Sequence, residues 1–186
     1  MFIQTEQTPN PASLKFLPGR EVVAGGVLDF TDPERVEASP LARRLFAVEG
    51  VTGVFLGADF VTVTKAEGQD WYVLKPAVLG AIMEHYLSGD PVIEPDVELA
   101  DEGGAPSGED DALVRQIREL IETRVRPAVA QDGGDIIFRG FERGVVYLHM
   151  RGSCAGCPSS TITLKNGIEN LLRYYVPEVV EVRPVA

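Results

Sequence analysis

Both cysteines of the chain lie in one short stretch, Gly152-Ser153-Cys154-Ala155-Gly156-Cys157-Pro158. A predicted strand from Val145 to Met150 precedes this stretch, and apolar residues at helical spacing follow it. The stretch therefore joins a strand to a helix, and this arrangement decides the fold of the second half of the chain. Pro158 suits the first position of a helix, because a proline there loses no helical hydrogen bond.

The predicted helix start gives the two thiols a chemical role. Cys157 fits the N-cap position, where free backbone N–H groups of the first helical turn point back toward it. These donors and the positive end of the helix dipole favour negative charge. We therefore expect Cys154 and Cys157 to have lowered thiol pKa values and to bind metal readily.

The number of cysteines limits the kind of metal site. Iron–sulfur clusters are usually held by four thiolates, and this chain has two cysteines in total. Two chains that meet at a symmetric interface would supply four thiolates. A cluster held by Cys154 and Cys157 therefore requires a homodimer.

The C-x-x-C spacing alone leaves several uses open: metal ligation, thiol–disulfide exchange and incidental placement. A thioredoxin-like motif belongs to a βαβ arrangement, normally with an aromatic residue before the first cysteine. A predicted two-strand hairpin precedes the motif here, and Ser153 stands before Cys154. This context disfavours thiol–disulfide exchange. Zinc would accept the same four thiolates across a dimer, and the sequence leaves it as an alternative.

The other elements of the second half follow from periodicity and turn signals. A helical stripe runs from Leu113 to Val125, and Pro127 should bend or restart that helix. The predicted elements after it are a turn over residues 132–135, strands over 136–141 and 145–150, a helix ended by Pro177 and a strand over 179–185. The order is α-β-β-α-β, which predicts a small α+β domain.

The first half predicts a second small α+β domain. Strand signals flank the turn-rich segment Thr8-Pro9-Asn10-Pro11, at residues 2–5 and 14–17. Ser39 and Pro40 suit the N-cap and first position of a helix. A hairpin over residues 51–65 and a helical stripe from Trp71 to Tyr86 complete the domain.

An acidic segment separates the two halves. The formal net charge of the chain is −11. Residues 91–110 contain 7 acidic and no basic residues, together with three prolines and a Gly-Gly pair. Such a segment buries little apolar surface and repels itself, so we expect an extended, mobile linker. The predicted organisation is a domain over 1–90, a linker over 91–110 and a domain over 111–186.

The overall charge excludes some classes of partner. General nucleic-acid binding and docking on anionic membrane both need a basic surface, and the chain is acidic. No stretch approaches the roughly 18–20 apolar residues that span a bilayer. The first residues lack the basic start and apolar run of a signal peptide. We therefore expect a cytoplasmic protein in a reducing compartment, where a C-x-x-C pair is more often catalytic or metal-binding than a structural disulfide.

The second half resembles the C-terminal domain of the NifU-like (Nfu) iron–sulfur protein family from Val129 to Val182. The matching residues include Asp132-Gly133-Gly134-Asp135, Gly152-Ser153-Cys154-Ala155-Gly156-Cys157-Pro158-Ser159-Ser160-Thr161 and Thr163-Leu164-Lys165-Asn166-Gly167-Ile168-Glu169. The first half is similar to the N-terminal domain of bacterial and mitochondrial Nfu proteins, through residues such as Thr8-Pro9-Asn10-Pro11, Ser39-Pro40-Leu41-Ala42 and Glu49-Gly50-Val51.

The resemblance implies a cluster carrier rather than an enzyme. It implies that Cys154 and Cys157 bind a [4Fe–4S] cluster bridged between two C-terminal domains. It further implies transfer of the cluster to apo iron–sulfur client proteins and receipt from an upstream donor. The cellular site implied is the bacterial cytosol, or the mitochondrial matrix for a processed form.

Other side chains could bind or react, but ordinary roles are expected for them. We expect His149 to be strand surface and His85 to be a solvated helix residue. Asp132 and Asp135 flank two glycines and are expected to form a turn. Trp71 is expected to pack in the core rather than to form an exposed anchor.

Overall fold

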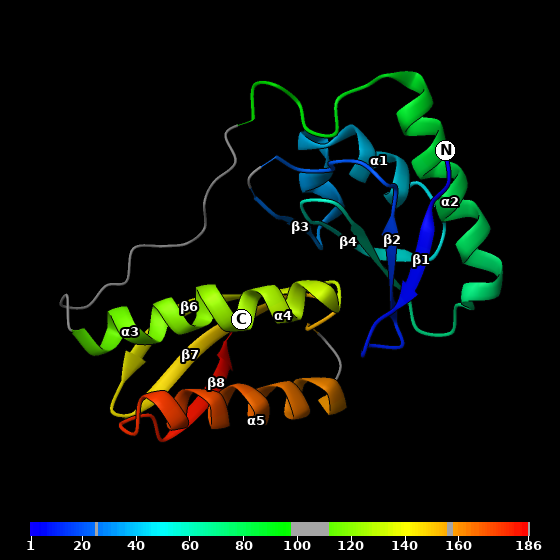
Figure 1. Ribbon diagram of the computed structural model, residues 1–186. Helices are drawn as coiled ribbons and strands as arrows, with labels where there is room; N and C mark the ends of the chain where they lie inside the picture. The colour runs from blue at the N-terminus through cyan, green and yellow to red at the C-terminus, as the bar shows by residue number, and fades with distance from the viewer. Residues whose placement is uncertain (25, 98–111, 156–157, 186) are drawn as a thin grey trace. The chain divides into compact units, whose positions relative to one another are not determined.

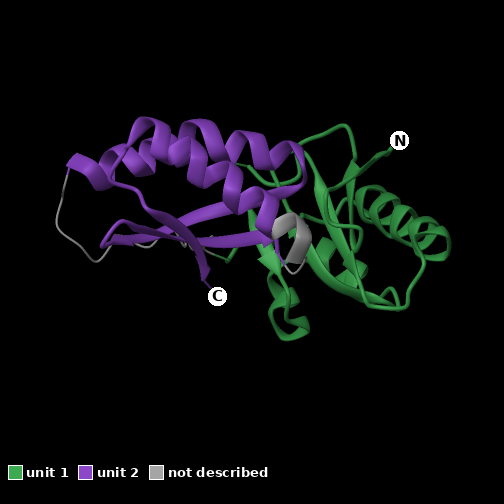
Figure 2. Cartoon of the chain, turned by 90° about the horizontal axis from the view of Figure 1, so that it is seen from below, with its two compact units in different colours: residues 1–100 green, residues 101–186 purple. Residues whose placement is uncertain are grey.

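The computed structural model describes residues 1–24, 26–97, 112–155 and 158–185. The chain divides into two compact units, Met1–Ala100 and Asp101–Ala186 (Figure 2). Each unit combines helices with a sheet, which confirms the predicted α+β class. Within the described ranges, no helix has both the length and the apolar character needed to cross a membrane.

The first unit is built on a five-stranded antiparallel sheet (Figure 1). The strands lie in the order β1-β2-β5-β4-β3. Their bounds are β1 (Gln4–Gln7), β2 (Ser13–Leu17), β3 (Leu28–Phe30), β4 (Val51–Leu56) and β5 (Val61–Lys65). β1 and β3 are therefore the two edges of the sheet.

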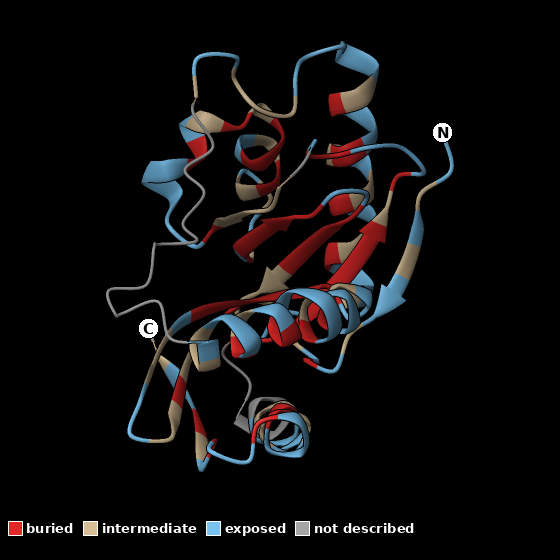
Figure 3. Ribbon diagram, turned by 60° about the vertical axis from the view of Figure 1, so that its left-hand side comes forward, coloured by how far each residue is buried: buried red, intermediate tan, exposed pale blue. Residues whose placement is uncertain are grey.

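Two helices cover one face of this sheet. Ser39 caps α1 (Pro40–Phe46) as predicted, since its Oγ accepts a hydrogen bond from the N–H of Ala42 at 3.1 Å. α2 (Trp71–Ser88) ends at Gly89, whose φ of 77° favours glycine. Alternate strand residues and the inner faces of both helices form one buried core (Figure 3). Trp71 packs against that core, as predicted, and its ring meets the ring of Phe16 edge-on.

Periodicity did not predict two elements of the first unit. β3 is three residues long, too short to show an alternating pattern. A 3-10 helix, η1 (Pro33–Ala38), follows it and begins at Asp32, whose carboxylate accepts from the N–H of Glu34. A 3-10 helix of 6 residues is too short to show an apolar stripe. β1 also begins at Gln4, two residues later than predicted.

The beginning of the predicted linker contacts the first unit. Ser39 Oγ donates to the carbonyl oxygen of Val92 at 2.5 Å, and the N–H of Glu94 donates to the carbonyl oxygen of Ala38 at 2.9 Å. Val92 and Ile93 pack against the first core. Most of the predicted linker, residues 98–110, lies outside the described residues.

The second unit is a three-stranded sheet with its helices on one face. Its helical elements are α3 (Ala112–Leu120), a π-helical turn η2 (Ile121–Val125), α4 (Arg126–Gln131) and α5 (Pro158–Tyr175). Its strands are β6 (Gly134–Glu142), β7 (Val145–Gly152) and β8 (Glu181–Val185). The predicted order is confirmed. Pro127 lies in the first turn of α4, just after the irregular turn, as its missing N–H requires.

The strand pairing of this unit places α5 in a crossover. β6 and β7 form an antiparallel hairpin, while β7 and β8 are parallel. α5 connects the two parallel strands and packs through Ile168 and Leu172 on the core that the sheet shares with α3. The cysteine stretch therefore lies where β7 passes into the crossover helix.

Candidate metal centre

Cys154 lies two residues after the end of β7 and four residues before α5. Its N–H donates to the carbonyl oxygen of Arg151 at 3.2 Å, and the N–H of Ala155 donates to that of Gly152 at 3.1 Å. The side chain of Cys154 is only 6% exposed. A tight turn thus carries the Cys154 side chain inward.

Gly134 provides the space for this thiol. It is the first residue of β6 and pairs with Gly152 at the end of β7. A Cβ atom at position 134 would overlap with Sγ of Cys154. The same Cβ would lie 3.1 Å from the carbonyl oxygen of Arg151 and 3.1 Å from the nitrogen of Cys154. The sulfur therefore occupies the place that a side chain would take at position 134.

Ser153 joins the turn over residues 151–155, the cysteine turn, to the residues that precede β6. Its Oγ donates to the carbonyl oxygen of Asp132 at 2.6 Å, and its N–H donates to that of Gly133 at 3.3 Å. Ser153 is fully buried at 1% exposure. The Asp132–Asp135 segment and the cysteine turn, far apart in sequence, therefore form one interlocked structure.

Asp135 belongs to β6 rather than to the turn, so the turn-forming role predicted for it is wrong. Its carboxylate is buried and accepts two hydrogen bonds from Arg126, at 2.8 and 3.1 Å. Arg126 also reaches Glu122, at 2.9 and 3.1 Å. Its hydrogen bonds to Asp135 and then to Glu122 raise the pKa of Arg126, although burial opposes them. The charge of Asp135 is therefore compensated next to Gly134.

The lowered thiol pKa predicted from the helix start is wrong for Cys154. Burial raises the pKa of this thiol to about 12, and the negative charges of Asp132 and Asp135 act in the same direction. A hydrogen bond with Ser153 opposes them. Removal from water disfavours the thiolate more than the hydrogen bond with Ser153 favours it. Cys157 lies outside the described residues, so its environment stays a prediction.

This burial makes the reactivity of Cys154 strongly dependent on pH. In a Cys157→Ser variant, we expect iodoacetamide to modify the remaining thiol slowly at pH 7 and faster as the pH approaches about 12. Only the thiolate reacts, and its fraction rises about tenfold per pH unit below the pKa. Mass spectrometry measures the rate. A rate that levels off near pH ~8.5, as for an unfolded control in urea, would contradict the buried position.

Neither histidine belongs to a group of metal-ligating side chains among the described residues. His149 Nδ1 lies 3.2 Å from the carbonyl oxygen of Val185, so it joins β7 to β8. His85 is fully buried, and the solvated role predicted for it is wrong. It follows Leu74, Val78 and Ile82 on the inner face of α2. Among the described residues, which exclude Cys157, no group of three or more His, Cys, Asp or Glu side chains is placed to hold a metal ion.

The buried His85 predicts a loss of stability in acid. Neither ring nitrogen has a hydrogen-bond partner among the described residues. Burial, and then the charge of Arg44, lower its pKa from 6.5, while Asp90 acts in the opposite direction. The folded state therefore takes up the proton at lower pH than the unfolded state, so stability is retained above about pH 6.5 and declines as the pH falls below it.

Urea unfolding of the full chain, followed by the fluorescence of Trp71, measures this effect in the first unit. We expect the free energy of unfolding to fall below about pH 6.5, by at most ~1.4 kcal/mol per pH unit for one proton. In a His85→Leu variant this part of the pH dependence should disappear. The same decline in both proteins would show that other groups cause it.

Two family models match the chain, one after the other. A model described as scaffold protein Nfu/NifU N terminal matches residues 3–89, within the first unit. A model described as NifU-like domain matches residues 117–183, within the second unit. The division into two units and the two family matches therefore agree.

Known proteins extend this similarity over the whole chain. The human protein named NFU1 iron-sulfur cluster scaffold homolog, mitochondrial, is 53% identical over 186 residues, which is 100% of this chain and 72% of the human protein. The protein of the same name from Drosophila erecta is 51% identical over 191 residues, 100% of this chain and 65% of its own length. A solution structure of a NifU-like protein from Saccharomyces cerevisiae covers 52% of this chain and 87% of its own, with 29% identity and a TM-score of 0.46. The ordered domain matches and the identity to the human protein show that this chain belongs to the Nfu/NifU family of scaffold proteins.

Proposed function

We propose that this chain carries an iron–sulfur cluster of the [4Fe–4S] type on Cys154 and Cys157 and transfers it to apo-proteins. The placement of the Cys154 thiol carries the proposal, since an interlocked turn holds it between β7 and α5, near the second cysteine in sequence. The relatives named as iron–sulfur cluster scaffolds support the cargo. A carrier of this kind has no catalytic residue of its own.

The donor set requires two chains. A cubane cluster takes four thiolates, and one chain supplies Cys154 and Cys157. A homodimer formed by two C-terminal domains, with the cluster on its two-fold axis, completes the set. The cluster then lies at a seam between chains, from which the thiols of a client protein can displace it.

The residues around Cys154 suit this cargo. The cluster with four thiolates carries net negative charge in its usual oxidised state, so nearby carboxylates would repel it. Arg126 compensates Asp135 through two hydrogen bonds. Ser153 holds the turn that carries Cys154 to the carbonyl oxygen of Asp132, and Gly134 leaves room for the sulfur. The chain thus offers a first ligand on a turn held by hydrogen bonds, with part of the local negative charge already neutralised.

Anaerobic reconstitution with iron and sulfide tests the proposal. The expected product has broad visible absorbance and about four irons per dimer. Cys154→Ser and Cys157→Ser should each lose it, because each variant removes two ligands from the dimer. A Cys154→Ser, Cys157→Ser double variant that still binds a full cluster would refute the ligand assignment. Zinc in place of iron, in protein purified without oxygen, would refute the cargo.

One observation favours a second function, thiol–disulfide exchange. β7, α5 and β8 form a parallel crossover, so the motif lies in a βαβ arrangement after all. The hairpin before the motif therefore does not count against exchange. A buried thiol with a raised pKa is a poor attacking nucleophile, whereas a bound metal ion would itself remove the proton from a coordinating thiol. Turnover of a test disulfide by the reduced metal-free protein would support exchange, and no turnover would remove it.

The partners and compartment follow from the same proposal. Apo iron–sulfur proteins would receive the cluster, and an upstream protein would supply it. The relatives are named as mitochondrial proteins. We therefore place the activity in the mitochondrial matrix for a processed form, or in the bacterial cytosol. Both compartments keep free thiols reduced.

A further inference from the structure

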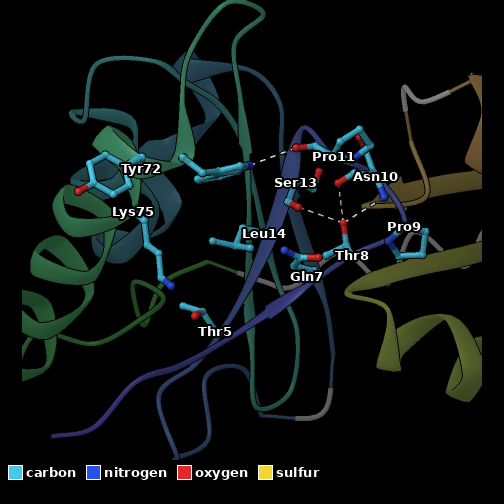
Figure 4. Close-up of a pocket in the computed structure, with 11 residues that line it drawn as sticks. Thr5, Gln7, Thr8, Pro9, Asn10, Pro11, Ser13, Leu14, Tyr72 and Lys75 are labelled. Atoms are coloured by element: carbon cyan, nitrogen blue, oxygen red, sulfur yellow. Dashed lines mark hydrogen bonds between the residues drawn. The ribbon is translucent and has the colours of Figure 1, made fainter.

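A groove on the first unit lies between β1 and the first turns of α2 (Figure 4). Its volume is about 570 Å³, within the range of ~300–1,000 Å³ typical of ligand sites. The Thr8–Pro11 motif forms one end of it. This motif has no role in the proposed cluster chemistry, which uses the second unit.

Hydrogen bonds fix the walls of the groove before any partner binds. Thr8 Oγ1 donates to the carbonyl oxygens of Asn10, at 2.8 Å, and Ser13, at 3.0 Å. Asn10 Oδ1 accepts from the N–H of Ala12 at 3.0 Å. Trp71 Nε1 donates to the carbonyl oxygen of Pro11 at 3.1 Å and so ties α2 to the turn. A preformed groove loses little conformational entropy on binding.

Among the described residues that line the groove, one is positively charged and none is acidic. Lys75 is the only charged residue among those that line it, although residues 1–90 contain 12 acidic and 7 basic residues. Figure 4 shows the Lys75 side chain extending from α2 toward Thr5 of β1. Lys75 forms no salt bridge with any residue in the described ranges. This charge distribution selects a partner that brings a carboxylate.

Two nearby acids already have partners. Glu6 of β1 pairs with Lys15 at 3.5 Å. Asp70 caps α2 and accepts from the N–H of Tyr72 at 2.9 Å. Neither of these carboxylates lines the groove. The amine of Lys75 is therefore the group with which an incoming acid would pair.

The edge of the sheet adjoins the groove. Among the described strands, β1 pairs with β2 alone, so its outer edge presents backbone N–H and C=O groups to a further strand. Tyr72, at 88% exposure, and the partly buried Trp71 supply aromatic surface beside it. An edge strand, an aromatic surface and a cation together match the recognition of an extended peptide.

We infer that this groove binds an extended acidic segment of a partner protein. A carboxylate of the segment pairs with Lys75, and a neighbouring apolar side chain packs against Trp71 and Tyr72. The backbone of the segment adds to the free edge of β1. The site lies wholly in the first unit and uses neither cysteine. A failure of peptide binding would therefore leave the proposed cluster binding unaffected, and the reverse also holds.

The only tryptophan of the chain provides the readout, because Trp71 lines the groove. The probe is a short peptide, blocked at both ends, in which Glu alternates with Leu. Titrated into the full chain, it should change the Trp71 fluorescence in a saturable way. Binding should weaken about tenfold when Gln replaces Glu in the peptide, and about tenfold in a Lys75→Glu variant.

Matched variants test whether peptide binding depends on this groove or only on the net charge of the chain. Arg35→Glu makes the same charge change on the exposed η1 segment, beside the opposite edge strand, and should leave binding unchanged. Tyr72→Ala should weaken binding while the circular dichroism stays the same. The inference is overturned if no saturable change occurs, if Arg35→Glu weakens binding as much as Lys75→Glu, or if the Gln peptide binds equally well. Equal competition by inorganic phosphate would indicate a site for small anions instead.

Discussion

A Gly134→Ala variant is expected to lose stable cluster binding and to unfold more easily in its second unit by ~1–3 kcal/mol. A Cβ atom at position 134 has no free space, since the Cys154 sulfur already occupies it. The sulfur cannot yield alone, because backbone atoms of Arg151 and Cys154 lie 3.1 Å from the same point. The turn that carries the proposed ligand Cys154 must therefore move.

Gly140→Ala is the matched control for this change. Gly140 lies on the same strand, and a Cβ atom there would meet nothing within 4 Å. Urea unfolding followed by circular dichroism measures both units, while Trp71 fluorescence reports on the first unit alone. Reconstituted absorbance measures the cluster. Equal behaviour of the two alanine variants would show that the contact between Gly134 and Cys154 has no consequence.

An Arg126→Met variant is expected to lower the free energy of unfolding of the second unit by ~3 kcal/mol. It leaves the carboxylate of Asp135, 5% exposed, without its two hydrogen bonds from arginine. An unpaired buried charge costs far more than the loss of a surface ion pair. The turn beside Cys154 should loosen as well, because Asp135 follows Gly134 directly.

Two further variants separate the contribution of the buried Arg126–Asp135 ion pair from that of the exposed Arg126–Glu122 pair. The side chain of Glu122 is 49% exposed, and Glu122→Gln removes its ion pair with Arg126. This change should lower the free energy of unfolding by less than ~1 kcal/mol. The double variant Arg126→Met, Asp135→Asn removes both charges and should recover part of the loss, as a double-mutant cycle would measure. Equal losses in Arg126→Met and Glu122→Gln would contradict the importance of burial at Asp135.

Local signals in the sequence were enough to predict most elements of both units. The Ser39 cap, the stripe of α2 and the strand before the cysteines are each encoded by neighbouring residues. β3 and η1 were missed because a strand of 3 residues and a 3-10 helix of 6 residues carry too little periodicity. The parallel pairing of β7 with β8 is a long-range contact, which no local pattern reveals.

The candidate site, too, was predictable where it depends on local sequence and not where it depends on long-range contacts. The spacing and position of the cysteines could be read from the chain, while the need for two copies stays a prediction. The environment of Cys154 could not, because it depends on the docking of the Asp132–Asp135 segment, about twenty residues away along the chain. That docking buries the thiol and reverses the pKa shift expected from the helix start. His85 was misjudged for the same reason, since only the packed helix shows which face is buried.

The mass of the reconstituted protein under native, oxygen-free conditions tests the central claim most directly, when iron and sulfide are measured on the same sample. We expect two chains that hold one cluster, with about four irons and four sulfides per pair. Removal of the cluster by a chelator should return protein without iron. A single chain that carries a complete cluster, or a dimer with bound zinc and no iron, would contradict the account.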